Sequence, residues 1–218
     1  ALMLSEDLST WGANLTEDGT IDISGALDSK MQNVGWTGEK VFECPGCAKL
    51  GSSKKQGNLT SPLITDHSAT SVTVRLSASA YGNDVAEATV SLLDKDDSVI
   101  SEQTVDMDGT LTTVVLANAN MDDYKVKVQP KKRGYVFSIA IYDGDFSAED
   151  FQSMGVAEKA VMKASAQRFS EIKTTSYKFE GLNAGATYQW RVCAVAGNVL
   201  SKWSDWQTVD LSAWSTIG

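Results

Sequence analysis

Apolar and polar side chains alternate almost perfectly from Val72 to Ala80. Val72 and Val74 fall on one side of this segment, whereas Thr73 and Arg75 fall on the other. A period of two residues is typical of a β-strand that buries only one of its faces. The same alternation recurs over residues 86–92, 124–129 and 135–141.

Residues 135–141 add a series of large apolar side chains to this pattern. We expect four of them to share the buried face of one strand: Tyr135, Phe137, Ile139 and Ile141. Turn-forming residues separate the expected strands at 81–84, 94–97, 108–109 and 133–134. Many short strands, spaced about ten residues apart, are typical of a β-sandwich or barrel. We therefore predict that residues 1–145 form one all-β domain.

The composition changes after residue 145. Residues 146–169 show only weak periodicity, which leaves a helical turn, an irregular linker or an edge strand open. Of these we favour a linker with an edge strand. The β pattern then returns in three expected strands, Ser176–Leu182, Thr187–Ala196 and Trp203–Leu211. Residues 146–218 are therefore predicted to form a second, smaller β-module that begins with this linker.

The charge balance limits the classes of partner. The 218 residues carry a net charge of −9, which argues against nucleic-acid binding because phosphate contacts need clustered Lys and Arg. It also disfavours binding to anionic lipid. No apolar run approaches the roughly 18 residues of a membrane span. The first residues lack the features of a signal peptide, so the chain is either cytosolic or has lost one.

Residues 35–63 contain three short motifs in a fixed order. They are Gly35-Trp36-Thr37-Gly38, Lys49-Leu50-Gly51-Ser52-Ser53 and Gly57-Asn58-Leu59-Thr60-Ser61-Pro62. This series resembles the pattern of jelly-roll domains in surface and secreted proteins of gut anaerobic bacteria, which are similar to cleaved-adhesin and carbohydrate-binding sandwiches. The resemblance implies a jelly-roll β-sandwich over residues 1–145.

A second resemblance lies in the C-terminal part, in residues 182–188, 190–195 and 203–206. These stretches are similar to the L-x-P-G-T-x-Y signature of fibronectin type III modules, with Ala184 and Ala186 in place of the usual Pro and Thr. The resemblance implies that Tyr188 forms a tyrosine corner, in which its hydroxyl bonds to the backbone upstream. Because a full module needs about 100 residues, we expect an abbreviated version over 146–218.

The two resemblances together imply an extracytoplasmic protein, located at the cell surface, in the periplasm or in the medium, whose signal peptide is absent from this sequence. They imply a non-catalytic adhesion-type role, with a glycan or an extracellular protein as the partner. Two alternatives stay open, because fold-level similarity is a weak argument for function. One is a structural spacer in a larger exported protein, and the other is a glycoside hydrolase or its accessory domain.

The resemblance to jelly rolls also implies a site for a calcium ion. In related domains this ion lies between an acidic residue near the N-terminus and two aspartates on the last strand. Glu6 matches the first position, but Ile139 and Ala140 stand where the resemblance places the aspartates. Calcium prefers six to eight oxygen ligands, so the loss of two carboxylates disfavours this structural calcium. We expect no cofactor and no metal site, and a structural calcium ion stays open as the alternative.

Cys44-Pro45-Gly46-Cys47 has the spacing of a redox pair or of half a zinc site. Zinc needs further soft or imidazole ligands, and only Cys193 and His67 remain. A redox role needs a βαβ context, which the strand pattern does not provide. We therefore interpret the motif as a tight turn, which a local disulfide closes if the protein is exported.

Aromatic side chains are the candidate ligand-binding residues, because an aromatic ring stacks on the apolar face of a sugar. Trp36 and Tyr81 lie in expected loops, and Trp11 lies near the start of the chain. Tryptophan is also a common core residue. We predict that these three contact the ligand.

The remaining charged residues do not indicate catalysis. A basic cluster at 125–133 is interpreted as a solvated hairpin face, and the acidic clusters at 94–97 and 122–123 as solvated turns. His67 is the single histidine, and neither a G-x-S-x-G motif nor an H-E-x-x-H motif occurs. No strand carries a run of carboxylates of the kind a glycosidase needs. We therefore predict no catalytic residues and no enzymatic activity.

Overall fold

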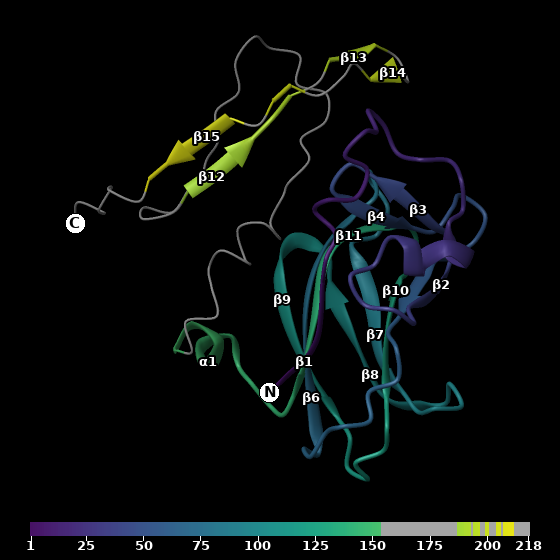
Figure 1. The fold of residues 1–218 in the computed structure, drawn as a ribbon, viewed down its shortest axis with the longest axis vertical. Helices are drawn as coiled ribbons and strands as arrows, with labels where there is room; N and C mark the ends of the chain where they lie inside the picture. The colour runs from purple at the N-terminus through teal and green to yellow at the C-terminus, as the bar shows by residue number, and fades with distance from the viewer. Residues whose placement is uncertain (154–186, 193, 197–198, 201–203, 206, 212–218) are drawn as a thin grey trace. The chain divides into compact units, whose positions relative to one another are not determined.

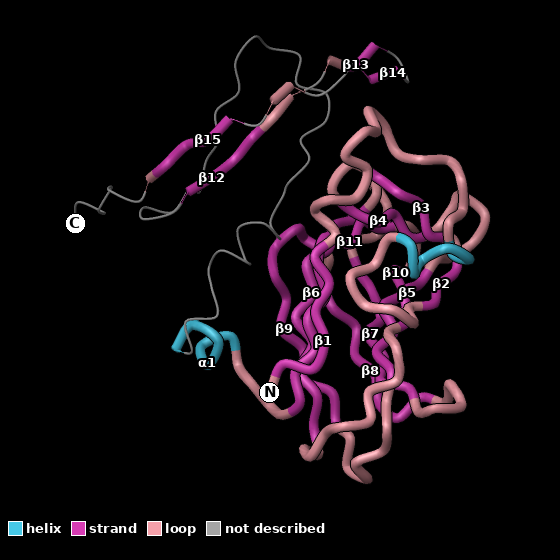
Figure 2. The backbone as a smooth tube through the Cα atoms, viewed as in Figure 1, coloured by secondary structure: helices cyan, strands magenta, loops and turns pink. Residues whose placement is uncertain are grey.

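The computed structural model describes residues 1–153, 187–192, 194–196, 199–200, 204–205 and 207–211. The chain divides into two compact units, Ala1–Ala166 and Gln167–Gly218. The first unit therefore continues past residue 145, where the sequence pattern places the end of the first domain. Nearly all of its regular structure is strand (Figure 2).

Sheet A contains six strands, five of which follow the order β3-β4-β11-β6-β9. They are β1 (Leu2–Asp7), β3 (Val41–Cys44), β4 (Cys47–Leu50), β6 (Ser71–Ala80), β9 (Asp108–Ala117) and β11 (Gly134–Asp143). One edge of β11 serves two partners in turn. Its first residues pair with β4, and its later residues pair with β1. All of these pairs are antiparallel.

Sheet B contains five strands in the order β2-β5-β10-β7-β8. They are β2 (Thr37–Glu39), β5 (Asn58–Thr60), β7 (Glu87–Leu93), β8 (Val99–Asp106) and β10 (Lys125–Pro130). Every pair is again antiparallel. The two sheets form an all-β sandwich (Figure 1), which confirms the predicted fold class.

The core lies between the two sheets. Val72 and Val74 of β6 belong to the same buried cluster as Val126 and Val128 of β10, and none of the four exposes more than a trace of its surface. Burial of each such side chain stabilises the fold by roughly 1.5–3 kcal/mol. The apolar side of the predicted alternation in residues 72–80 and 124–129 therefore faces this core. The expectation that residues 72–80 bury only one face was wrong, because Thr73, Arg75 and Ser77 on the polar face of β6 are buried as well.

Strand β11 departs from the predicted pattern. A β-bulge interrupts its pairing with β6 between Val136 and Ser138. Ile139 and Ile141 lie in the core, whereas Tyr135 and Phe137 belong to a separate cluster with Cys44 and Cys47. The expectation that the four apolar residues share one face was wrong, because a bulge adds one residue and reverses the face of the residues beyond it.

A short helix, α1 (Ala148–Ser153), follows β11. It begins with a reciprocal cap, in which the Asp150 backbone N–H donates to Ser147 Oγ and the Ser147 backbone N–H donates to Asp150 Oδ2. Such a cap satisfies donors that the first turn of a helix leaves free. The structure thus adds a helix over 148–153 to the segment 146–169, and the edge strand that we favoured stays a prediction, because residues 154–169 lie outside the described part of the chain. No helix in the described part of the chain is long and apolar enough to cross a membrane.

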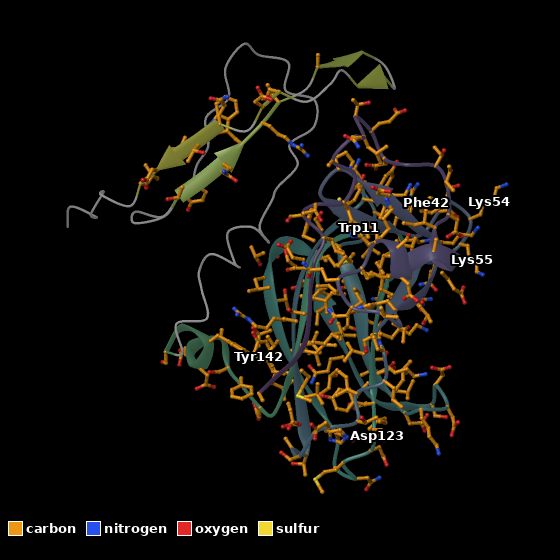
Figure 3. All side chains as sticks on the ribbon, viewed as in Figure 1. Trp11, Phe42, Lys54, Lys55, Asp123 and Tyr142 are labelled. Carbon is orange, nitrogen blue, oxygen red and sulfur yellow. The ribbon has the colours of Figure 1, made fainter. Side chains whose placement is uncertain are left out.

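Helix α1 packs against sheet A through Phe151, which is fully buried. The Phe151 ring meets the Tyr142 ring edge-on with centroids 4.7 Å apart, and the Arg75 guanidinium carbon lies 4.1 Å from its centroid. Tyr142, which Figure 3 labels on the side of α1, also contacts Phe146. These contacts join residues 146–151 to the first unit.

In the second unit, β12 (Thr187–Trp190) pairs antiparallel with β15 (Gln207–Asp210), and β13 (Val195–Ala196) pairs with β14 (Val199–Leu200). The predicted strand Thr187–Ala196 is thus divided between β12 and β13. The predicted strand Ser176–Leu182 lies outside the described residues. The tyrosine corner of Tyr188 stays a prediction, because the segment just upstream of β12 lies outside them as well.

Candidate ligand-binding groove

A polar groove with a volume of about 590 Å³ crosses the outer face of sheet B. All five strands of the sheet contribute to its lining, which includes Glu39, Asn58, Thr60, Ser91, Glu102 and Lys127. The residues that line it include no aromatic side chain. The groove is therefore a surface for hydrogen bonding rather than for ring stacking.

The register of sheet B builds the floor of this groove. Thr60 on β5 pairs with both Thr37 on β2 and Lys127 on β10. Lys127 pairs with Ser91 on β7, and Ser91 pairs with Glu102 on β8. Residues directly opposite each other in antiparallel strands point to the same face. One polar row thus runs across all five strands.

The core explains why this row points outward. Leu59, Val128 and Leu92 each neighbour a member of the row along the chain, and all three are buried in the core cluster. Side chains alternate between faces along a strand, so these three buried neighbours direct Thr60, Lys127 and Ser91 to the outside. Burial of the apolar residues therefore positions the polar ones.

Two acidic residues of the groove are already paired with lysines. The Lys55 ammonium lies 3.0 Å from Glu39 Oε2, and the Lys125 ammonium pairs with Asp97. The hydrogen bond from Lys55, together with its charge, lowers the pKa of the Glu39 carboxyl. A glycosidase needs a general acid whose pKa is raised. Glu39 is shifted in the opposite direction and does not fit that role.

Glu102 and Lys127 differ from these pairs. Glu102 Oε2 accepts a hydrogen bond of 3.3 Å from the Ser91 hydroxyl. Lys127 is half-buried and makes neither an ion pair nor a side-chain hydrogen bond with the residues that the structure describes. The floor thus presents a cation with no close ion pair between the hydroxyls of Thr60 and Ser91.

The structure places the predicted ligand-binding aromatics elsewhere. Trp36 and Trp11 are each only 4% exposed, so neither offers a ring face for stacking. The Trp11 side chain lies near the β3–β4 end of the unit (Figure 3). Tyr81 is half-buried, and its ring packs against the Arg133 guanidinium at 4.3 Å and the Tyr135 ring at 5.7 Å. None of the three predicted residues lines the groove.

Glu6 explains the burial of Trp36. This carboxylate is 2% exposed and accepts hydrogen bonds of 2.8–2.9 Å from the backbone N–H groups of Gln32 and Asn33, from Asn33 Nδ2 and from Trp36 Nε1. A buried charge is costly unless it is compensated by such bonds. Trp36 is thus a hydrogen-bond partner of Glu6, which sequence periodicity does not show.

The surroundings of Glu6 do not fit a calcium ion. Calcium binds oxygen ligands, whereas both oxygens of this carboxylate face N–H donors. On the paired strand β11, Glu6 lies opposite Ile139, with Ser138 and Ala140 on either side, so no carboxylate comes from there. Within the described residues, no group of three or more His, Cys, Asp or Glu side chains is placed to hold a metal ion.

Cys44 and Cys47 face each other across the β3–β4 hairpin. Gly46 has a φ of 76°, which suits the third position of a type II turn with Pro45 before it. Both thiols are buried and free in the structure. The side-chain contact with Cys47, together with burial, raises the pKa of the Cys44 thiol. The motif is therefore a tight turn, in agreement with the sequence interpretation.

The basic cluster at 125–133 is largely neutralised by residues of the 84–97 region. Ion pairs join Lys125 to Asp97, Lys131 to Glu87 and Arg133 to Asp84. This pairing removes most of the charge that a phosphate backbone would need.

The groove was not predicted from the sequence, because periodicity shows which residues point away from the core but not which strands are neighbours.

Similarity to known proteins is confined to distant structural likeness. No protein-family model matches the chain, and no curated protein matches it. A solved structure of the BiXyn10A CBM1 shares 9% identity, covering 66% of this chain and 99% of its own, with a TM-score of 0.38.

Two further solved structures are comparably distant. The K1 cleaved adhesin domain of Lys-gingipain from Porphyromonas gingivalis W83 shares 14% identity, covering 65% of this chain and 98% of its own, with a TM-score of 0.35. An isomalto-dextranase from Arthrobacter globiformis T6 shares 13% identity with a TM-score of 0.36. It covers 49% of this chain, which spans only 21% of that protein.

The first unit is an all-β sandwich with an open polar groove.

Replacing Glu6 with Gln is expected to lower the free energy of unfolding by about 3 kcal/mol, since buried N–H donors lose a charged acceptor. Glu17→Gln, which removes the same charge from an exposed residue, is the matched control and is expected to change it by less than about 0.5 kcal/mol. Urea unfolding at pH 7 measures both. Equal values for the two variants contradict the structural role of Glu6.

The burial of Cys44 and Cys47 predicts that their thiols react slowly in the native protein, because the thiolate is the reactive form. We test this in a reduced Cys193→Ser variant with Ellman's reagent. The labelling rate of both thiols is expected to be at least about 100-fold higher in the unfolded protein than in the native protein. Glutathione in the same buffer calibrates the reagent. Rapid labelling of the native protein would contradict the burial of the two thiols.

Proposed function

We propose that the first unit is a non-catalytic binding module that binds a glycan chain in the groove of sheet B. The observation that carries this proposal is the polar row from Thr37 to Glu102, which crosses all five strands. It offers hydroxyl, carboxylate and ammonium groups on one open face. A hydroxyl-rich ligand both donates and accepts hydrogen bonds, and this set of groups matches both needs.

The length of the row favours an oligomeric ligand. Neighbouring strands lie about 4.8 Å apart, so five strands extend over roughly 19 Å. A single sugar would contact only part of this row. A chain lying across the strands would contact all of it, and many modest hydrogen bonds would add to a useful affinity.

An extracytoplasmic, adhesion-type role follows as part of the same proposal. The resemblance of residues 35–63 to surface jelly rolls supports it, as does the resemblance of the second unit to a fibronectin type III module. In that arrangement the sandwich binds the ligand, and the second unit connects it to the rest of a surface protein. The proposal assigns no catalytic role to any groove carboxylate.

Asn58→Ala combined with Gln129→Ala tests the proposal, because both side chains line the groove. Each lost hydrogen bond costs about 1 kcal/mol, so we expect affinity to fall by at least about tenfold for any glycan found on an array. Isothermal titration calorimetry measures it.

Tyr81→Ala is the contrasting variant, since this ring lies outside the groove. We expect it to bind like the wild type, and circular dichroism establishes that each variant is folded. Loss of binding in Tyr81→Ala with full binding in the groove variant would assign the ligand to the loops. Absence of binding to every glycan tested would favour the spacer alternative.

A further inference from the structure

We propose that the groove selects acidic glycans, and that the Lys127 ammonium pairs with a sugar carboxylate over the β5–β10 half of the floor. This inference rests on the proposed glycan-binding function and adds the chemical class of the ligand. The inference is based on Lys127, a lysine that lines the groove and makes no ion pair with the described residues.

Lys127 lies at the centre of the groove. It is on β10, the middle strand of sheet B, with Thr60 on one side and Ser91 on the other. Thr60 and Ser91 are 7% and 6% exposed, so both hydroxyls lie deep in the floor. The Lys127 ammonium and the Thr60 hydroxyl supply donors that a carboxylate accepts, whereas the Ser91 hydroxyl already donates to Glu102.

The other lysines near the groove are already neutralised. Lys55 is paired with Glu39 and Lys125 with Asp97. Lys127 is half-buried and makes no close ion pair in the part of the chain that the structure describes, and its charge reaches Glu39 only from beyond ion-pair distance. A partly desolvated cation without a partner costs free energy, which an incoming anion would recover. The groove therefore offers one position at which a negative charge would be stabilised.

The charges are also distributed unequally along the row. On the side of β2 and β5, Glu39 is balanced by Lys55, and Lys127 adds a positive charge whose field reaches Glu39. On the opposite side, Glu102 adds a negative charge on the edge strand β8. A carboxylate is attracted to the first side and repelled from the second. This asymmetry gives the bound chain a preferred position.

A panel of three acidic polymers tests the inference: polygalacturonate, alginate and glucuronoxylan, each compared with its carboxyl-reduced, neutral form. The wild type is expected to bind at least one acidic chain about tenfold more tightly than the neutral form of the same backbone. Lys127→Gln is expected to lose that preference. Binding to the neutral chains is expected to change by less than about twofold, because their hydrogen bonds remain.

Lys132→Gln is the matched control, because it removes the same charge from an exposed turn residue outside the groove. Glu102→Gln is expected to tighten binding to the acidic chain. If Lys127→Gln loses no more acidic preference than Lys132→Gln, or if no acidic chain is preferred, the inference is overturned. Neutral glycans would still bind in that case if the proposed function holds, whereas absence of all binding overturns both.

Discussion

Packing of Val126 and Val128 into the core fixes the direction of every other side chain on β10. Because strand side chains alternate, Lys125, Lys127 and Gln129 must point to the outer face. A shift of one residue would drive the lysines into the core, where an unpaired ammonium is far too costly. The same rule acts on β5 and β7. The apolar core therefore determines the polar groove, and the groove needs no stabilisation of its own.

Glu6 connects this sandwich to the edge of the groove. Its carboxylate lies on β1 of sheet A, yet its donors come from residues 32–36, directly before β2 of sheet B. The buried charge thus fixes where the chain enters the edge strand that carries Thr37. Where related jelly rolls suggested calcium, N–H dipoles compensate the carboxylate instead. Four N–H groups of residues 32–36 donate to this buried charge.

The sequence was sufficient for the position and the core-facing side of strands whose alternation is regular, as in residues 72–80 and 124–129. It did not show that the polar face of β6 is also buried, with Arg75 against Phe151. It failed over 135–141, because a bulge leaves no mark in hydrophobic periodicity. It also failed for Trp36, whose exposure depends on a hydrogen bond to a residue 30 positions away. The groove could not be derived, since strand order in a sandwich comes from long-range pairing. Alternation identified Lys127 as outward, but only the register placed it between Thr60 and Ser91.

The net charge of −9 makes the role of Lys127 local rather than long-range. A polyanion approaching this chain is repelled overall, and the Debye length of about 8 Å at physiological salt confines the attraction of one lysine to the groove itself. Salt therefore has two opposing effects: it weakens the contact with Lys127, and it screens the general repulsion. Selectivity for an acidic ligand in such a protein must come from contact geometry, because electrostatic steering works against it.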